Sequence, residues 1–178
     1  MKKPIWRIFV DGSDSDVPWL THKPNPRFSI FTAAPETAND DLVFDKETGL
    51  IWPRNPTAIA GTTPFSWLDA NTRCREIKIV NRIGWRLPTL EELSSLVDTR
   101  PHAPTQPALP VGHPFLAVKF GSGIDPYWTS TNYENSAGSG GSAWFVELGG
   151  GAAGLGLKGN MGYAWPVRGG RGGVSWNW

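Results

Sequence analysis

The spacing of apolar side chains predicts a helix over Thr63–Ile77. Thr63 is a plausible N-cap and Pro64 a plausible first helical residue. The apolar residues that recur at helical intervals are Trp67, Ala70, Cys74 and Ile77. We therefore expect this helix to bury one face, with Cys74 on it.

A second helix is predicted over Thr89–Val97. Thr89 and Glu92 have the spacing of a capping box, in which each side chain satisfies a backbone N–H group of the first turn. Leu93, Leu96 and Val97 supply its buried face.

Extended segments lie on both sides of these helices. Before them, Leu42–Asp45 and Leu50–Trp52 flank the turn 46–49 and have the form of a hairpin. After them, short apolar runs between Gly-, Ser- and Asn-rich stretches predict four strands: Tyr127–Thr131, Ala143–Leu148, Gly154–Lys158 and Ala164–Arg168. The alternating start of the segment 1–26 predicts one edge strand followed by an extended arm.

This order of elements predicts an α+β fold with an antiparallel sheet and the helices gathered on one side of it. The proline-rich segment 100–120 lacks periodicity, so we expect a long loop packed by its own Leu109, Val111, Phe115 and Leu116. A length of 178 residues suits one domain. We place it at residues 25–171, between an N-terminal arm (1–24) and a C-terminal tail (172–178).

Composition excludes several functional classes. The 17 Lys and Arg residues balance 16 Asp and Glu, so no net field attracts nucleic acid. No apolar run approaches the roughly 20 residues that a membrane span needs, and no membrane insertion is expected. A single cysteine forms no intrachain disulfide, and residues 1–10 contain no apolar run of signal-peptide length. The chain has 10 Trp, more than one small core needs.

Candidate catalytic and metal-binding groups are few. His22, His102 and His113 lie near prolines in predicted loops and lack the spacing of metal ligands. The acidic run 11–16 lacks the glycine and glutamate of a helix-loop-helix calcium site. We find no motif of a hydrolase, metalloprotease or nucleotide-binding loop. The prediction is a protein that is not an enzyme and uses no cofactor and no metal.

Several motifs occur together in the order of a known family. They are Asp45–Trp52 (DKETGLIW), Gly84–Leu93 (GWRLPTLEEL), Tyr127–Thr131 (YWTST), Ala143–Trp144 and Trp165–Gly170 (WPVRGG). The chain resembles the C-terminal domain family of the Legionella collagen-like protein. The resemblance implies a C-type-lectin-like fold, shared distantly by formylglycine-generating enzymes and retroelement variable proteins. It also implies a bacterial protein that is extracellular or at the cell surface, although no export signal is visible here.

The motif residues have mostly structural interpretations. Trp85, Trp128, Trp144 and Trp165 are typical core residues. Arg86 and Arg168 lie in apolar motifs, where each is expected to satisfy carbonyl groups or a carboxylate of the fold; binding of an acidic ligand is the alternative. The Glu-Pro-Asn, Gln-Pro-Asp and Trp-Asn-Asp triplets of calcium-dependent lectins are absent from the chain, and Cys74 alone does not supply the two-cysteine site of the enzymatic relatives.

Two loops after the helices carry the candidate ligand-binding residues. They are Asn132, Tyr133, Glu134, Asn135, Lys158, Asn160 and Tyr163, whose side chains suit adaptable contacts but also suit solvated hairpin loops. The charges of Glu134 and Lys158 leave these loops nearly neutral. A highly sulfated polysaccharide normally needs a cluster of basic residues, so we do not expect one as the ligand.

Two functions remain open. One is a non-catalytic ligand-binding or adhesion module that takes a protein or glycan ligand through these loops. The other is a structural subunit of a surface or filamentous assembly held together by apolar tails. The candidate contacts of a homo-oligomer are Trp6, Trp19, Trp176 and Trp178.

Overall fold

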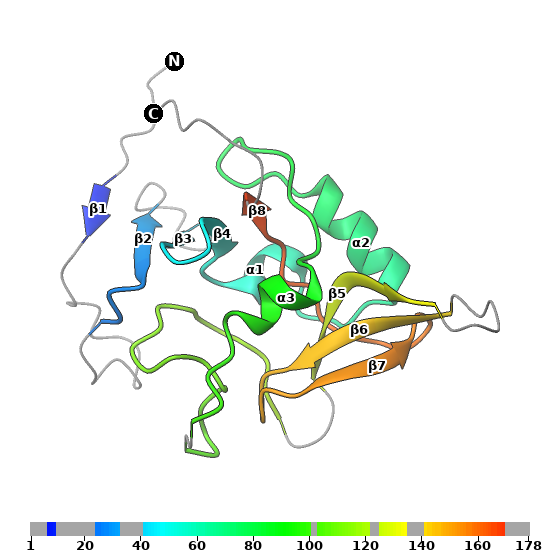
Figure 1. Ribbon diagram of the computed structural model, residues 1–178. Coiled ribbons are helices and arrows are strands. Elements are labelled where there is room, and N and C mark those ends of the chain that lie inside the picture. Colours follow the sequence, from blue (N-terminus) through cyan, green and yellow to red (C-terminus); the bar gives the residue numbers. More distant parts are fainter. Residues whose placement is uncertain are drawn as a thin grey trace.

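The structure is a computed structural model that describes residues 7–9, 24–32, 41–100, 103–121, 125–134 and 141–169. Its strands form two antiparallel sheets, with the orders β1-β2-β3-β4-β8 and β5-β6-β7 (Figure 1). The strands of the larger sheet are β1 (Arg7–Phe9), β2 (Phe28–Thr32), β3 (Leu42–Asp45), β4 (Leu50–Pro53) and β8 (Arg168–Gly169). Those of the smaller sheet are β5 (Pro126–Tyr133), β6 (Ser142–Glu147) and β7 (Ala153–Leu157). The α+β class is confirmed, in agreement with the C-type-lectin-like fold that the resemblance implies.

The predicted hairpin is confirmed as β3 and β4. Gly49 closes its turn with a φ of +71°, a conformation that costs glycine little. The Asp45 carboxylate accepts hydrogen bonds from the Glu47 N–H and the Thr48 hydroxyl, which holds the turn in place. β2 pairs with the other edge of β3 and was not predicted, although Asn25 and Pro26 just before it are typical turn residues.

The first predicted helix begins later than expected. α2 spans Trp67–Glu76, and its N-cap is Ser66, whose hydroxyl accepts the Asp69 N–H, so the prediction of Thr63 as N-cap is wrong. Phe65, just before the cap, pairs with Gly162, which keeps the preceding residues out of the helix. A short helix α1 (Pro56–Ala60) precedes it, capped by Asn55 and missed by the sequence analysis.

The second predicted helix is shorter than expected. α3 spans Leu90–Ser94 rather than continuing to Val97, although its capping box is formed as predicted. The Thr89 hydroxyl accepts the Glu92 N–H, and the Glu92 carboxylate accepts the Thr89 N–H. Leu93 and Leu96 are fully buried, as the apolar pattern indicated.

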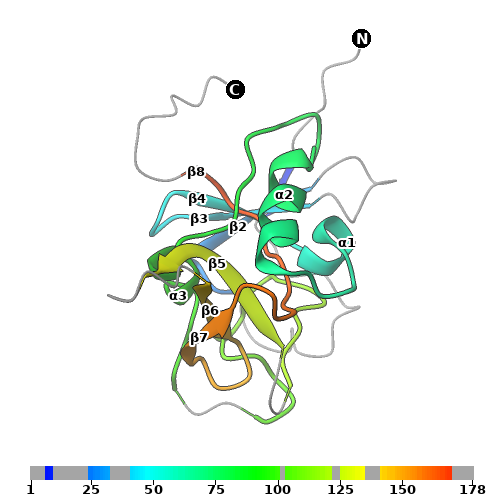
Figure 2. The same ribbon diagram turned by 90° about the vertical axis from the view of Figure 1, so that its right-hand side faces the viewer.

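The two predicted helices, α2 and α3, lie on opposite faces of the smaller sheet, which corrects the expectation that they share one side (Figure 2). On one face, Leu93 and Leu96 join a core with Tyr127 and Val146. On the other, Ala70 and Cys74 of α2 join a core with Trp128. Alternate residues of β5 and β6 therefore face different cores, and the sheet is buried on both sides.

The last predicted strand, Ala164–Arg168, differs from the observed strand β8. Residues 164–167 do not extend the β5-β6-β7 sheet; the chain instead continues to β8, which pairs with β4. This pairing joins the two halves of the chain. Trp165 precedes β8 and packs against Trp52 of β4, with ring centroids 5.7 Å apart. Its indole N–H donates to the Pro53 carbonyl at 3.3 Å.

The tryptophans of the family motifs divide into two groups. Trp85, Trp128 and Trp165 are buried as predicted. Trp144 is only half-buried, which is a correction: it lies opposite Leu155 of the edge strand β7, where nothing covers the ring completely. Within the loop 103–121, Leu109 and Phe115 are buried, Leu116 is half-buried and Val111 is exposed.

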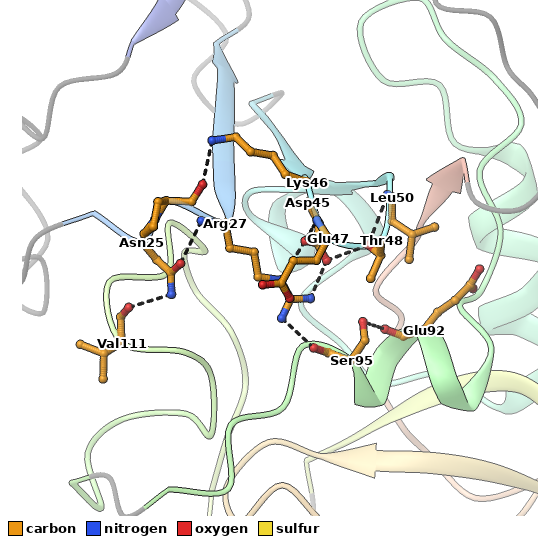
Figure 3. A network of polar contacts seen from close by, with 11 residues as sticks. Asn25, Arg27, Asp45, Lys46, Glu47, Thr48, Leu50, Glu92, Ser95 and Val111 are labelled. Atoms are coloured by element: carbon orange, nitrogen blue, oxygen red, sulfur yellow. Dashed lines mark hydrogen bonds and ion pairs between the residues drawn. The ribbon is translucent and has the colours of Figure 1, made fainter.

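A polar network fixes the entry to the larger sheet (Figure 3). The Arg27 guanidinium donates two hydrogen bonds to the buried Asp45 carboxylate, at 2.8 and 2.6 Å, and a third to the Ser95 carbonyl. Burial by itself would raise the pKa of Asp45, but the bonds from Arg27 and Thr48 outweigh it and hold the pKa below its usual value. The network connects β2, β3 and the end of α3.

The long loop is held by backbone bonds and by a buried histidine. Leu116 N–H donates to the Arg54 carbonyl, and the Arg54 guanidinium donates to the Pro114 carbonyl. His113 is buried, and its Nδ1 accepts the Phe115 N–H at 3.2 Å. Burial lowers the pKa of His113 to about 4. The other two histidines lie outside the described residues.

Replacing Trp165 by Ala is expected to destabilise the fold by about 3–5 kcal/mol, because the ring is fully buried among aromatic neighbours. Replacing Trp144 by Ala should cost clearly less, because part of that ring is exposed. Urea unfolding of the two variants measures the difference. Equal losses of stability would contradict the assignment of Trp144 to a half-buried position.

Stability is expected to fall between pH 7 and pH 5. The pKa of His113 is lower in the folded chain than the ordinary value of 6.5, so its contribution is present above about pH 6.5 and is lost as the pH falls toward 4. The expected loss at pH 5 is about 2 kcal/mol. His113→Asn keeps an acceptor but cannot titrate, so urea unfolding of this variant should show little of the loss. An equal loss in both proteins would rule out His113 as its source.

Candidate ligand-binding site

The structure gathers four of the predicted ligand-binding residues at one end of the smaller sheet. Asn132 and Tyr133 end β5, and Glu134 follows them. Lys158 follows β7, whose last residue Leu157 pairs with Ser142, the partner of Tyr133. The Lys158 ammonium lies 4.7 Å from the centre of the Trp67 ring, at cation–π distance. We call Asn132, Tyr133, Glu134 and Lys158 the sheet-end patch.

The other predicted residues lie elsewhere. Tyr163 belongs to the opposite end of the sheet, where its backbone pairs beside Tyr127 and its ring packs 5.8 Å from the Tyr127 ring. Asn160 lies in the crossing segment between β7 and this pairing. Asn135 and the four candidate oligomer contacts, Trp6, Trp19, Trp176 and Trp178, lie outside the described residues.

Asn160 lines a hollow on the α2-facing side of the smaller sheet, with a volume of about 280 Å³. We call this feature the hollow. Its residues come from β5, β6, β7 and the segment after β7: Pro126, Trp128, Phe145, Glu147, Leu155, Gly156, Asn160 and Met161. The half-buried Phe145 ring contributes an aromatic surface, while Glu147 and Asn160 contribute polar groups.

Two glycines of β7 make room for this aromatic surface. A Cβ atom on Gly154 would lie 2.6 Å from the Phe145 ring, and one on Gly156 would lie 2.9 Å from the Trp128 ring. Gly154 pairs with Phe145 across the sheet, so the ring rests on glycine backbone. Strand glycines of this kind often mark a close approach of a ring or backbone.

Two polar side chains of the hollow have no partner among the residues that the structure describes. Within the described ranges, the Glu147 carboxylate and the Asn160 side-chain amide have no hydrogen-bond or ion-pair partner. Both groups are therefore available to a ligand. A carboxylate here favours hydroxyl or cationic groups and disfavours anions.

The two motif arginines have different environments. Arg86 satisfies the structural prediction: it binds Glu92 through two hydrogen bonds of 2.7 and 2.6 Å and also donates to the Leu87 and Gly169 carbonyls. Arg168 does not, because its buried Nη1 has no hydrogen-bond partner among the described residues. Burial and the nearby Arg82 lower the pKa of Arg168.

Groups with catalytic or metal-binding potential do not gather at the hollow. Cys74 is buried in α2, as predicted, and burial raises the pKa of its thiol to about 12, so it is unreactive near neutral pH. In the part of the chain that the structure describes, no three His, Cys, Asp or Glu side chains form a group able to hold a metal ion. The same part contains no helix that meets the length and hydropathy needed to span a bilayer.

Sequence reasoning missed most of the hollow. It identified Asn160 but not Phe145, Glu147 or Met161, because these residues meet only when β6 and the crossing segment are folded together. One signal was present in the sequence: glycines at positions 154 and 156 alternate within a predicted strand.

Gly154→Ala is expected to displace the Phe145 ring and to lower stability by about 1–3 kcal/mol, since the added methyl group overlaps that ring. Gly150→Ala is the matched control, because a Cβ atom there has no neighbour within 4 Å. Thermal unfolding of both variants tests this. If Gly154→Ala were as stable as the control, the glycine would not be needed for the aromatic surface.

Comparison with known proteins agrees with the motifs of the sequence. The family model of the Lcl C-terminal domain matches residues 41–168, a span that begins at the start of β3 and includes the smaller sheet. No curated protein shows a significant match to the chain. The matched span covers most of the described residues, and the chain belongs to the Lcl C-terminal domain family, that of the Legionella collagen-like protein.

Proposed function

We propose that this domain is a non-catalytic binding module that holds an uncharged ligand group, such as one ring of a neutral glycan, in the hollow. The observation that carries the proposal is the hollow itself, where an aromatic ring surface lies beside a carboxylate and an amide that have no partner among the described residues. The family fits a bacterial surface-type protein of the collagen-like kind. An adhesive role at a cell surface is consistent with such a module.

Size and charge limit the ligand. A volume of about 280 Å³ lies at the lower end of small-molecule sites, which favours a single ring or side chain over a longer unit. Glu147 would repel a sulfate or carboxylate placed beside it. A sugar ring can lay its apolar face on Phe145 while its hydroxyl groups donate to Glu147 and bond to Asn160.

Asn132 of the sheet-end patch extends the same surface. Asn132 pairs with Ala143, so its side chain lies on the face of the sheet that also carries Phe145. Tyr133 lies on the opposite face, 6.4 Å from the Trp144 ring. A ligand longer than one ring would therefore reach Asn132 before Tyr133.

The absence of catalysis is part of the proposal. Cys74, the only thiol of the chain, is buried and does not line the hollow, and His113 is buried beside Phe115 of the long loop. The structural-subunit function depends on the four tail tryptophans outside the described residues and remains a prediction from the sequence.

Asn160→Ala is expected to weaken binding of a neutral glycan about three- to tenfold, the loss of one hydrogen bond. Asn71→Ala makes the same chemical change at a half-buried position of α2 that does not line the hollow, and it should leave binding unchanged. A glycan array identifies the ligand, and titration calorimetry compares the variants. Preference for sulfated over neutral glycans, or equal binding by both variants, would reject the hollow as the site.

Chelation is expected to have no effect. EDTA should leave both the melting temperature and any glycan binding unchanged, because ligand recognition is assigned to an aromatic ring and two polar side chains. Differential scanning fluorimetry with and without EDTA measures the first, and the calorimetric titration measures the second. A melting temperature that falls with EDTA and recovers with added calcium would contradict this.

A further inference from the structure

β7 is an open edge of the smaller sheet. The sheet order ends at β7, and β6 is its only strand neighbour among the described residues (Figure 1). The bonds that flank β7 show which backbone groups face β6: Glu147 N–H donates to Ala152 C=O, and Lys158 N–H donates to Gly141 C=O. Because facing alternates along a strand, Ala153, Leu155 and Leu157 direct their backbone groups away from β6.

This edge lacks the features that usually prevent strand pairing. β7 has the sequence AGLGL, with no charged residue and no proline, and its register with β6 is regular over all five residues. Leu155 and Leu157 are 42% and 62% exposed, so the strand presents apolar side chains as well as outward-facing backbone groups. Natural edge strands normally carry a charge, a proline or a bulge.

We propose that the β7 edge is a homotypic interface, on which β7 of a second copy of this chain pairs antiparallel to form a continuous six-stranded sheet. The pairing is centred on Leu155, so that Leu155 lies opposite Leu155 of the second copy. The Leu155 N–H and C=O groups bond reciprocally across the two-fold axis. Leu157 N–H donates to the Ala153 carbonyl of the second copy, while the Leu157 carbonyl stays bonded to Asn160 N–H within its own chain.

The strand is complementary to itself in volume and charge. In the centred register, the small Ala153 lies opposite the large Leu157 on each side of the axis, and the two Leu155 side chains meet at the centre. Lys158 lies opposite Ala152, so the register brings no two like charges face to face. A two-fold interface requires this kind of self-complementarity. A charged foreign strand would find no opposite charge on β7.

The interface is expected to be weak in isolation. Two five-residue strands bury much less than the roughly 800 Å² per partner of a standard interface. The dimer should therefore form as the concentration rises into the range of about 0.1–1 mM. Leu155 also lines the hollow, but the pairing is argued from the backbone groups and apolar side chains of β7 alone, so the inference does not depend on the proposed function.

Sedimentation equilibrium of the full chain, without ligand, tests the proposal. The wild-type mass should rise with concentration from 19.5 kDa toward twice that value. Leu155→Lys should remain at the mass of one chain, because two ammonium groups would meet at the axis. Leu68→Lys is the matched control: Leu68 is 66% exposed on α2, and its replacement should leave the rise in mass unchanged.

Cross-linking tests the register independently. The Cβ atoms of a hydrogen-bonded antiparallel pair lie about 5 Å apart, beyond the roughly 3.5–4.5 Å of a disulfide but within reach of a short cross-linker that joins two thiols. A short bis-maleimide should join Leu155→Cys into a covalent dimer, whereas Leu68→Cys should stay uncoupled, and the buried Cys74 should not compete. A wild type that stays monomeric to about 1 mM would overturn the proposal. So would a dimer that Leu155→Lys leaves intact or a Leu155→Cys variant that does not cross-link.

Discussion

The packing of Trp165 is the interaction on which the rest of the structure depends. Its ring contacts Trp52 of β4, Phe115 of the long loop and Tyr127 of β5, with ring centroids 4.9–5.7 Å apart. These neighbours come from three separate parts of the chain, so their contact closes the larger sheet, anchors the loop and positions the smaller sheet. Aromatic pairs at such distances contribute beyond their buried area, which suits a fold without a disulfide.

Several charged side chains form hydrogen bonds that hold irregular segments against the helices and strands. Arg27 links Asp45 to the end of α3, and Arg86 links Glu92 to the Gly169 carbonyl beside β8. Burial opposes the ionisation of Glu92, but the bonds from Arg86 and Thr89 keep its pKa below the usual value. Among the residues that line the hollow, the charged one is Glu147, and its carboxylate suits an uncharged ligand better than an anionic one.

The glycines of β7 connect the two proposals. Their missing side chains allow Phe145 to lie over the strand and form the aromatic side of the hollow. The same alternation leaves Ala153, Leu155 and Leu157 as the side chains of the opposite face. One short sequence therefore provides both the room for a ligand and an apolar edge, and Leu155 contributes to both.

The sequence by itself determined the local features whose physical cause lies within a few residues. The capping box of Thr89 and Glu92 and the turn closed by Gly49 need only neighbouring backbone groups, and both formed as predicted. The burial of Cys74 followed from helical periodicity. The combination of motifs was sufficient to identify the family over residues 41–168.

Only the tertiary structure decided where these elements meet. The start of α2 moved to Trp67 because Phe65 pairs with Gly162, almost one hundred residues later. Trp144 is half-buried because its strand neighbour Leu155 lies at a sheet edge, and β8 joined the larger sheet because Trp165 packs beside β4. The hollow likewise requires β5, β6, β7 and the segment at Asn160 to come together. Periodicity reports which face of an element is apolar, but the partner of that face is set by contacts between residues distant in the chain.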